Sequence, residues 1–155
     1  MTDLAVLDRA HLAIMRTFVE TGRAPHYVEL ARDLGLGVEE GRQVVLDLMD
    51  SGVPAWVHPQ TDYIVSVAPF NNLPTQYRVT IDGHQKWFAQ CGFEALAIRW
   101  LFPGKTVRVD APCLDCGGSV RVEMRDEAVL AVEPAAMVGY AYSQVGGPPE
   151  NRPFR

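Results

Sequence analysis

A cysteine and a glutamate stand three residues apart near the middle of this sequence, at Cys91 and Glu94. If both belong to one helix, their side chains lie on the same face. The backbone amides at the start of a helix favour thiolate over thiol. A thiolate next to a carboxyl group can capture a soft metal and deliver a proton, so Cys91 and Glu94 are the candidate catalytic residues. A buried cysteine that packs as a small hydrophobe is the alternative interpretation.

The other two cysteines form a Cys-x-x-Cys motif, Cys113 and Cys116, which two glycines follow. This spacing resembles half of a structural zinc site, which normally has four ligands. Cys91 could provide a third sulfur, and His84 or Glu94 a fourth ligand. The predicted metal ligands are therefore the three cysteines of the chain, Cys91, Cys113 and Cys116. A redox disulfide between Cys113 and Cys116 is the alternative.

Helical spacing of apolar residues predicts three helices in the first half of the chain. They run from Leu4 to a stop at Gly22, over residues 27–34 and over residues 38–49, and two short strands follow at 55–57 and 63–67. This order of elements is that of a winged helix. We expect residues 1–68 to form a winged-helix-like subdomain.

The third of these helices is too acidic to read DNA. Its charged residues are one cation, Arg42, and four anions, Glu39, Glu40, Asp47 and Asp50. The phosphate backbone would repel such a surface. We therefore expect a structural or interaction role for the subdomain and no nucleic-acid partner.

The second half of the chain predicts a small antiparallel sheet with one central helix. Strands are expected at 77–81, 105–110, 119–124 and 128–133, and a helix over residues 87–101. The whole chain is thus expected to be α+β, with residues 69–145 as the core on which the winged-helix-like subdomain packs. Residues 146–155 are expected to form a Pro/Gly-rich tail.

The composition is that of an ordinary globular protein, with 48% hydrophobic residues, 21% charged residues and a formal net charge of −5. The acidic balance again argues against general nucleic-acid binding. No stretch approaches the roughly 20 apolar residues of a membrane span, and the N-terminus lacks a secretory apolar core. Because three cysteines cannot all pair in disulfides, we expect a cytoplasmic protein with free or metal-bound thiols. The oligomeric state cannot be read from the sequence.

A longer pattern connects these motifs to a known family. Four segments resemble, in order, segments of the alkylmercury lyases. They are Ala-Pro-Phe-Asn-Asn-Leu-Pro-Thr-Gln-Tyr-Arg-Val at 68–79, Trp-Phe-Ala-Gln-Cys-Gly-Phe-Glu-Ala-Leu at 87–96, the strand at 105–109, and Ala-Val-Glu-Pro-Ala at 131–135. The chain is identified as a shortened or divergent member of that family.

The resemblance implies a reaction and assigns roles in it. In alkylmercury lyases, two cysteines and an aspartic acid cleave a carbon–mercury bond by protonolysis. By resemblance, Cys91 is the first catalytic thiolate, and Glu94 replaces the aspartate as proton donor with a reach one methylene longer. Cys113 matches a family cysteine with a structural role. The second catalytic cysteine belongs to a later segment with which no residue here aligns, and Cys116 is the candidate to replace it.

The resemblance also implies a small organometallic substrate, with mercury as the substrate metal and no required cofactor. Two other functions stay open at this point. The same fold could be a non-catalytic module that binds zinc or a partner through its cysteines, in which case metal removal would destabilise it. A descendant of the family could also act on a different substrate, such as an intermediate of secondary metabolism.

Overall fold

The computed structural model describes residues 2–139. The chain divides into two compact units between Leu73 and Pro74, whereas the predicted boundary followed residue 68. The predicted tail, residues 146–155, lies outside the described residues. Within the described part, no helix has the length and apolar character needed to cross a membrane.

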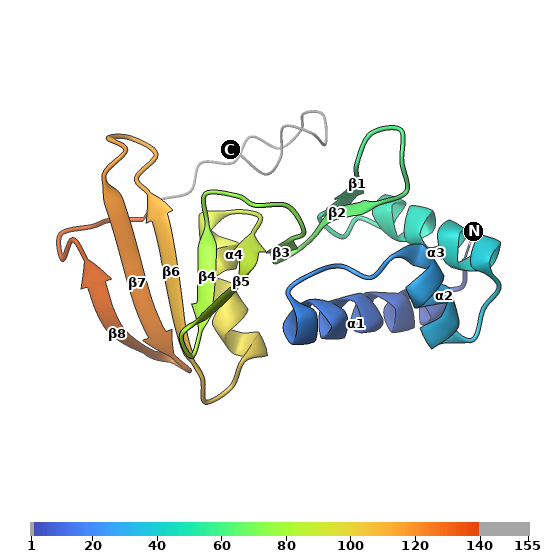
Figure 1. The fold of residues 1–155 in the computed structure, drawn as a ribbon, viewed down its shortest axis with the longest axis horizontal. Coiled ribbons are helices and arrows are strands. Elements are labelled where there is room, and N and C mark those ends of the chain that lie inside the picture. Colours follow the sequence, from blue (N-terminus) through green and yellow to red (C-terminus); the bar gives the residue numbers. More distant parts are fainter. Residues whose placement is uncertain (1, 140–155) are drawn as a thin grey trace. The chain divides into compact units, whose positions relative to one another are not determined.

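The N-terminal unit contains three helices and three short strands (Figure 1). Its helices are α1 (Leu4–Thr21), α2 (Tyr27–Leu34) and α3 (Val38–Asp50), which confirms the three predicted helices. Its strands are β1 (Ala55–Val57), β2 (Ile64–Val67) and β3 (Phe70–Asn71), which pair antiparallel in that order. The first two strands were predicted, whereas no strand was predicted at residues 70–71.

An aromatic pair lies in the core of this unit. The rings of Phe18 and Phe70 are stacked with their centroids 5.0 Å apart, and neither side chain is exposed. The hydroxyl of Ser66, which is also fully buried, donates to the Phe70 carbonyl oxygen over 2.8 Å. The strand that carries Phe70 is thus held by both ring stacking and a satisfied polar group.

The C-terminal unit is a five-stranded antiparallel sheet with a short helical segment packed on it (Figure 1). The order in the sheet is β5-β4-β6-β7-β8. The bounds are β4 (Arg78–Ile81), β5 (His84–Ala89), β6 (Thr106–Pro112), β7 (Ser119–Arg125) and β8 (Ala128–Glu133). Together with the helices of the chain, this sheet establishes the predicted α+β class.

One face of this sheet is apolar and the other is polar. Because side chains alternate along a strand, Val79 of β4 and its partner Val109 of β6 lie on one face, and both are buried. Helix α4 (Gly92–Ala97) contacts β5, and the 3₁₀ turn Ile98–Leu101 contacts β6. Ala95 and Ile98 of this segment are fully buried, so the apolar face supports the helix that follows Cys91.

The predicted helix over residues 87–101 is wrong at its start. Trp87 and Ala89 belong to β5, where both are buried, and the helix begins only at Gly92. A turn at Asp82-Gly83 brings residues 84–89 back alongside β4. Hydrogen bonds and side-chain packing with β4 therefore outweigh the helical spacing of the apolar residues in this stretch.

The close contact between α2 and α3 depends on Gly41. A Cβ atom at this position would lie 2.4 Å from the Cβ of Ala31 and 3.0 Å from the carbonyl oxygen of Tyr27. We expect Gly41→Ala to push the helices apart and to lower the free energy of unfolding by about 1–3 kcal/mol, measured by urea denaturation. Gly139→Ala is the control, because no atom lies within 4 Å of its added methyl. If both variants unfold at the same urea concentration as the parent, the helices are not in this contact.

Candidate active site

Cys91 and Glu94 lie at the two sides of the first turn of α4. Cys91 is the N-cap residue, with an extended backbone at φ −145° and ψ 175°, and Glu94 is the third residue of the helix. These two positions face each other across the first turn. Burial raises the pKa of the Glu94 carboxyl group, and the thiol and the backbone amide of Cys91, which both act on this group, oppose the rise. The predicted proximity is confirmed, although it arises from a helix cap rather than a helix face.

Burial dominates the electrostatics of Glu94. Its Oε2 atom is shielded from solvent and has no hydrogen-bond partner among the described residues. Burial raises the pKa of the carboxyl group, and this outweighs the lowering by the thiol and amide of Cys91. Since desolvation penalises the charged form, Glu94 accepts and holds a proton more readily than an exposed glutamate does.

The thiol of Cys91 is also half-buried, and this burial raises its pKa. The carboxyl group of Glu94 raises it further, whereas the backbone amides of Glu94 and Phe93 lower it. The amides at the start of the helix do act in the predicted direction, but their effect is the smaller one. The predicted net shift toward thiolate is therefore wrong, and the sulfur keeps its proton to a higher pH than a free cysteine.

Cys113 and Cys116 lie in the loop that joins β6 to β7. The Cys113 amide donates to the Gly118 carbonyl oxygen over 2.7 Å, and the Gly117 amide donates to the Cys113 carbonyl oxygen over 2.9 Å. The backbone amides of Cys116 and Asp115, and then the Cys116 thiol, lower the pKa of Cys113. Both cysteines are free, so the structure contains no disulfide between them. Cys113 is thus the cysteine whose surroundings favour thiolate.

The structure brings the predicted residues together as two pairs, Cys91 with Glu94 and Cys113 with Cys116. Within residues 2–139, no three His, Cys, Asp or Glu side chains gather closely enough to hold a metal ion. The three-cysteine ligand set is therefore not assembled in the described part of the chain. His84, considered as a fourth ligand, is exposed at the first position of β5.

Tyr77 is a neighbour of the site that the sequence analysis did not single out. A Cβ atom at Gly92 would lie 3.5 Å from the Tyr77 ring, so this ring borders the turn directly after Cys91. The Tyr77 carbonyl oxygen accepts from the Ala89 amide over 3.1 Å, which ties it to the end of β5. Its place in the family-like segment at 68–79 was the signal that could have identified it.

Comparison with known proteins identifies the family. The family model described as MerB, alkylmercury lyase, matches residues 70–152, more than half of the chain. An alkylmercury lyase of Staphylococcus epidermidis is 31% identical over 110 residues, which are 71% of this chain and 47% of that protein. An alkylmercury lyase of Bacillus cereus is 26% identical over the same shares. This chain belongs to the alkylmercury lyase family.

A solved structure has a fold similar to that of this chain. The crystal structure of the mercury-bound form of MerB2 aligns with a TM-score of 0.61 at 17% sequence identity. The alignment covers 84% of this chain and 66% of that chain. The chain spans about half the length, 47%, of the curated relatives it matches.

The buried carboxyl group should make stability depend on pH. The folded-state pKa of Glu94 is raised, so its contribution to stability is fully present below the ordinary glutamate pKa of about 4.3 and is lost as pH rises through the folded value. Glu94→Gln removes the ionisable group, and with it this loss of stability at high pH. We expect the variant to exceed the parent in unfolding free energy by about 1 kcal/mol at pH 8, and to match it near pH 3.5.

Urea denaturation at both pH values measures this difference. Glu127→Gln makes the same change at an exposed position and should follow the parent at both values. A constant difference between Glu94→Gln and the parent across this pH range would contradict a raised pKa at Glu94.

Proposed function

We propose that this chain carries a carbon–mercury lyase site in which Cys91 captures the metal and Glu94 delivers the proton. The observation that carries the proposal is the buried Oε2 atom of Glu94, which has no partner among the described residues, on a carboxyl group of raised pKa next to a thiol. Perturbed acids beside a nucleophile are typical of catalytic sites. Family membership supports the substrate class, a small organomercurial.

The proposed reaction moves one proton through the pair. As the Cys91 sulfur binds mercury, its thiol proton passes to the Glu94 carboxylate, and the anion that balanced the organomercurial cation leaves. The electron pair of the carbon–mercury bond then takes this proton from Glu94 and becomes the new carbon–hydrogen bond. The hydrocarbon leaves, mercury stays on the Cys91 sulfur, and Glu94 returns to its carboxylate form. The raised pKa of Glu94 suits it to hold the proton between these steps.

Cys116 is the proposed replacement for the second thiol of the family. It is exposed on the loop between β6 and β7, where a thiol can exchange metal with solvent. In the described residues it lies with Cys113 and not in a group of three with Cys91. A mutation at Cys116 therefore tests whether this thiol captures or releases mercury, separately from the bond cleavage at Cys91.

We also propose that the N-terminal unit has a winged-helix-like architecture with a structural role. The order of α1, α2, α3, β1 and β2 supports this assignment. Helix α3 carries Glu39 and Glu40 in its first turn, and its Arg42 forms ion pairs with Asp62 at 2.6 Å and with Glu39 at 3.7 Å. With that cation paired, the helix offers no basic surface to a phosphate backbone.

Two substitutions test the lyase proposal. We expect Cys91→Ser to abolish release of hydrocarbon from an organomercurial, because the serine hydroxyl is a poor ligand for a soft metal. Glu94→Gln should bind the substrate but release hydrocarbon about 10²–10⁴-fold more slowly, the usual contribution of a general acid. Gas chromatography of the released hydrocarbon and determination of protein-bound mercury separate the two effects.

Glu127→Gln is the matched control for this test, because it makes the same chemical change as Glu94→Gln away from Cys91 and Glu94. Cys116→Ser reports whether a second thiol is needed. Parent-like turnover in both Cys91→Ser and Glu94→Gln would rule the lyase proposal out. Stoichiometric binding by the parent without hydrocarbon would reduce the proposed site to metal capture.

The second candidate function is a zinc-binding module, and the lowered pKa of Cys113 favours it. Thiolates are the zinc ligands of structural sites, and a Cys-x-x-Cys turn presents two of them. The amides that act on the Cys113 sulfur are those that a bound thiolate requires. Two further ligands would have to come from outside the groups assembled in residues 2–139.

Metal removal distinguishes this candidate from the lyase. If zinc is bound, the purified protein should contain it, and a chelator should lower the melting temperature by about 4 °C or more. Cys116→Ser should show the lower melting temperature without chelator. A metal-free protein whose melting temperature does not respond to chelator excludes the zinc function and leaves the lyase proposal untouched.

A further inference from the structure

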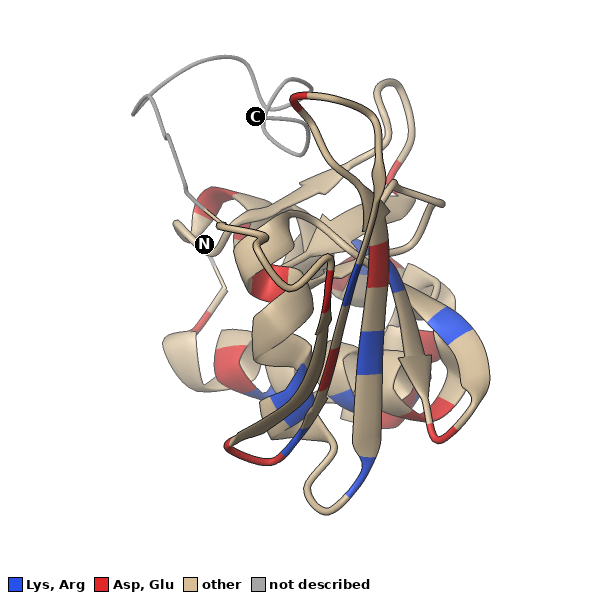
Figure 2. Cartoon of the chain, turned by 90° about the vertical axis from the view of Figure 1, so that its left-hand side faces the viewer, with Lys and Arg blue, Asp and Glu red and all other residues tan. Residues whose placement is uncertain are grey.

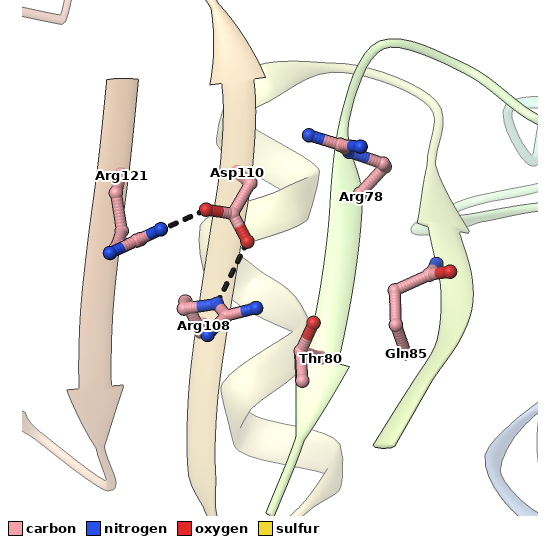
Figure 3. Close-up of a pocket in the computed structure, with 6 residues that line it drawn as sticks. All are labelled: Arg78, Thr80, Gln85, Arg108, Asp110 and Arg121. Carbon is pink, nitrogen blue, oxygen red and sulfur yellow. Dashed lines mark hydrogen bonds and ion pairs between the residues drawn. The ribbon is translucent and has the colours of Figure 1, made fainter. Parts of the chain in front are cut away.

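The polar face of the sheet in the C-terminal unit contains a cavity that neither Cys91 nor Glu94 lines. Its volume is about 380 Å³, within the lower range of small-molecule sites. It lies over neighbouring strands β5, β4, β6 and β7 (Figure 3), and its lining residues are Arg78, Thr80, Gln85, Arg108, Asp110 and Arg121.

This cavity carries a positive charge on an acidic protein. Its lining has three guanidinium groups and one carboxylate, a formal charge of 3 − 1 = +2, although Glu133 outside the lining also pairs with Arg121 at 3.4 Å. Basic and acidic positions are otherwise interspersed along the strands (Figure 2). The register of the strands brings these charged side chains together. Asp110 of β6 lies directly between Arg78 of β4 and Arg121 of β7. Glu123, the partner of Arg108 on β7, is not part of the lining.

Asp110 orients two of the three arginines. Its Oδ2 accepts from Nε of Arg108 over 2.8 Å, and its Oδ1 accepts from Nε of Arg121 over 2.9 Å (Figure 3). Because Arg108 is held through Nε, its two terminal nitrogens have no partner among the described residues. Those nitrogens form the edge of a guanidinium that binds carboxylate or phosphate oxygens in pairs.

Two further donors in the cavity lack partners. The Thr80 side chain is only 4% exposed, and its buried hydroxyl has no hydrogen-bond partner within residues 2–139. A buried polar group without a partner destabilises a fold, so such a group calls for an explanation. The Arg78 guanidinium also makes no ion pair or hydrogen bond with the described residues, and Figure 3 shows it on the same strand as Thr80.

We propose that this cavity binds a small oxyanion with two negative charges, a phosphate or a dicarboxylate, through Arg78, Arg108 and Thr80. One such ligand would satisfy the hydroxyl of Thr80 and the free guanidinium edges at the same time. Asp110 is a positioning residue, because it holds Arg108 and Arg121 in place and donates no hydrogen bond to the ligand. The site does not depend on the proposed lyase reaction, since none of its residues takes part in that reaction.

Isothermal titration calorimetry at low ionic strength and pH 7.5 tests the proposal, with inorganic phosphate and succinate as probes. We expect saturable binding of at least one probe by the parent protein. Arg78→Gln should weaken that binding about tenfold, the effect of losing one charge-assisted hydrogen bond. Thr80→Val should also weaken it, and should keep or raise the melting temperature because it removes the unpartnered hydroxyl.

The control is Arg16→Gln, which removes one exposed positive charge from α1. It should bind the probes as the parent does. Preference for phosphate or for succinate identifies which of the two anion geometries the cavity recognises. The proposal is overturned if neither probe saturates, if Arg78→Gln binds like the parent, or if Arg16→Gln weakens binding as much as Arg78→Gln. Because Arg78 is exposed, its variant decides the matter even if Thr80→Val does not fold.

Discussion

Strand β4 is the element on which the C-terminal unit depends. It pairs with β5 on one side and with β6 on the other, so its four residues set the register of both ladders. Alternation along this strand then serves two purposes. Val79 and Ile81 build the apolar face that supports α4, while Arg78 and Thr80 line the charged cavity. A one-residue slip in β4 would exchange the two faces and disrupt the helix start and the cavity together.

Stability alone does not explain why Cys91 and Glu94 are partly buried at the start of α4. A protein that only needed to be stable would leave a glutamate at this position exposed, where its charge is well solvated. Here burial raises the pKa of Glu94 and of Cys91 alike, so two acidic groups compete for ionisation in one small volume. Raised pKa values of this kind are characteristic of sites where a proton is transferred. The local chemistry of this pair is therefore what the proposed lyase site rests on.

Prediction from sequence succeeded where structure is local. The helices α1, α2 and α3 each carry their own apolar spacing, and Gly22 and Gly35 end the first two with left-handed backbones. The stretch around Trp87 failed, because its strand form depends on pairing with β4. The spacing of Cys91 and Glu94 was sufficient to pair them. The direction of their pKa shifts and the charged cavity were not predictable, since burial and three-strand register arise only in the folded chain.

The opposite surroundings of Cys91 and Cys113 give the protein two thiols of unequal nucleophilicity. Alkylating reagents attack thiolate, so at neutral pH the Cys113 sulfur, supported by the loop amides, reacts before the half-buried Cys91 sulfur. A brief treatment with iodoacetamide would then block the β6–β7 loop and spare the first turn of α4. The fold thus allows the β6–β7 loop, which also holds the exposed Cys116, to be labelled before the first turn of α4 in the unmutated chain.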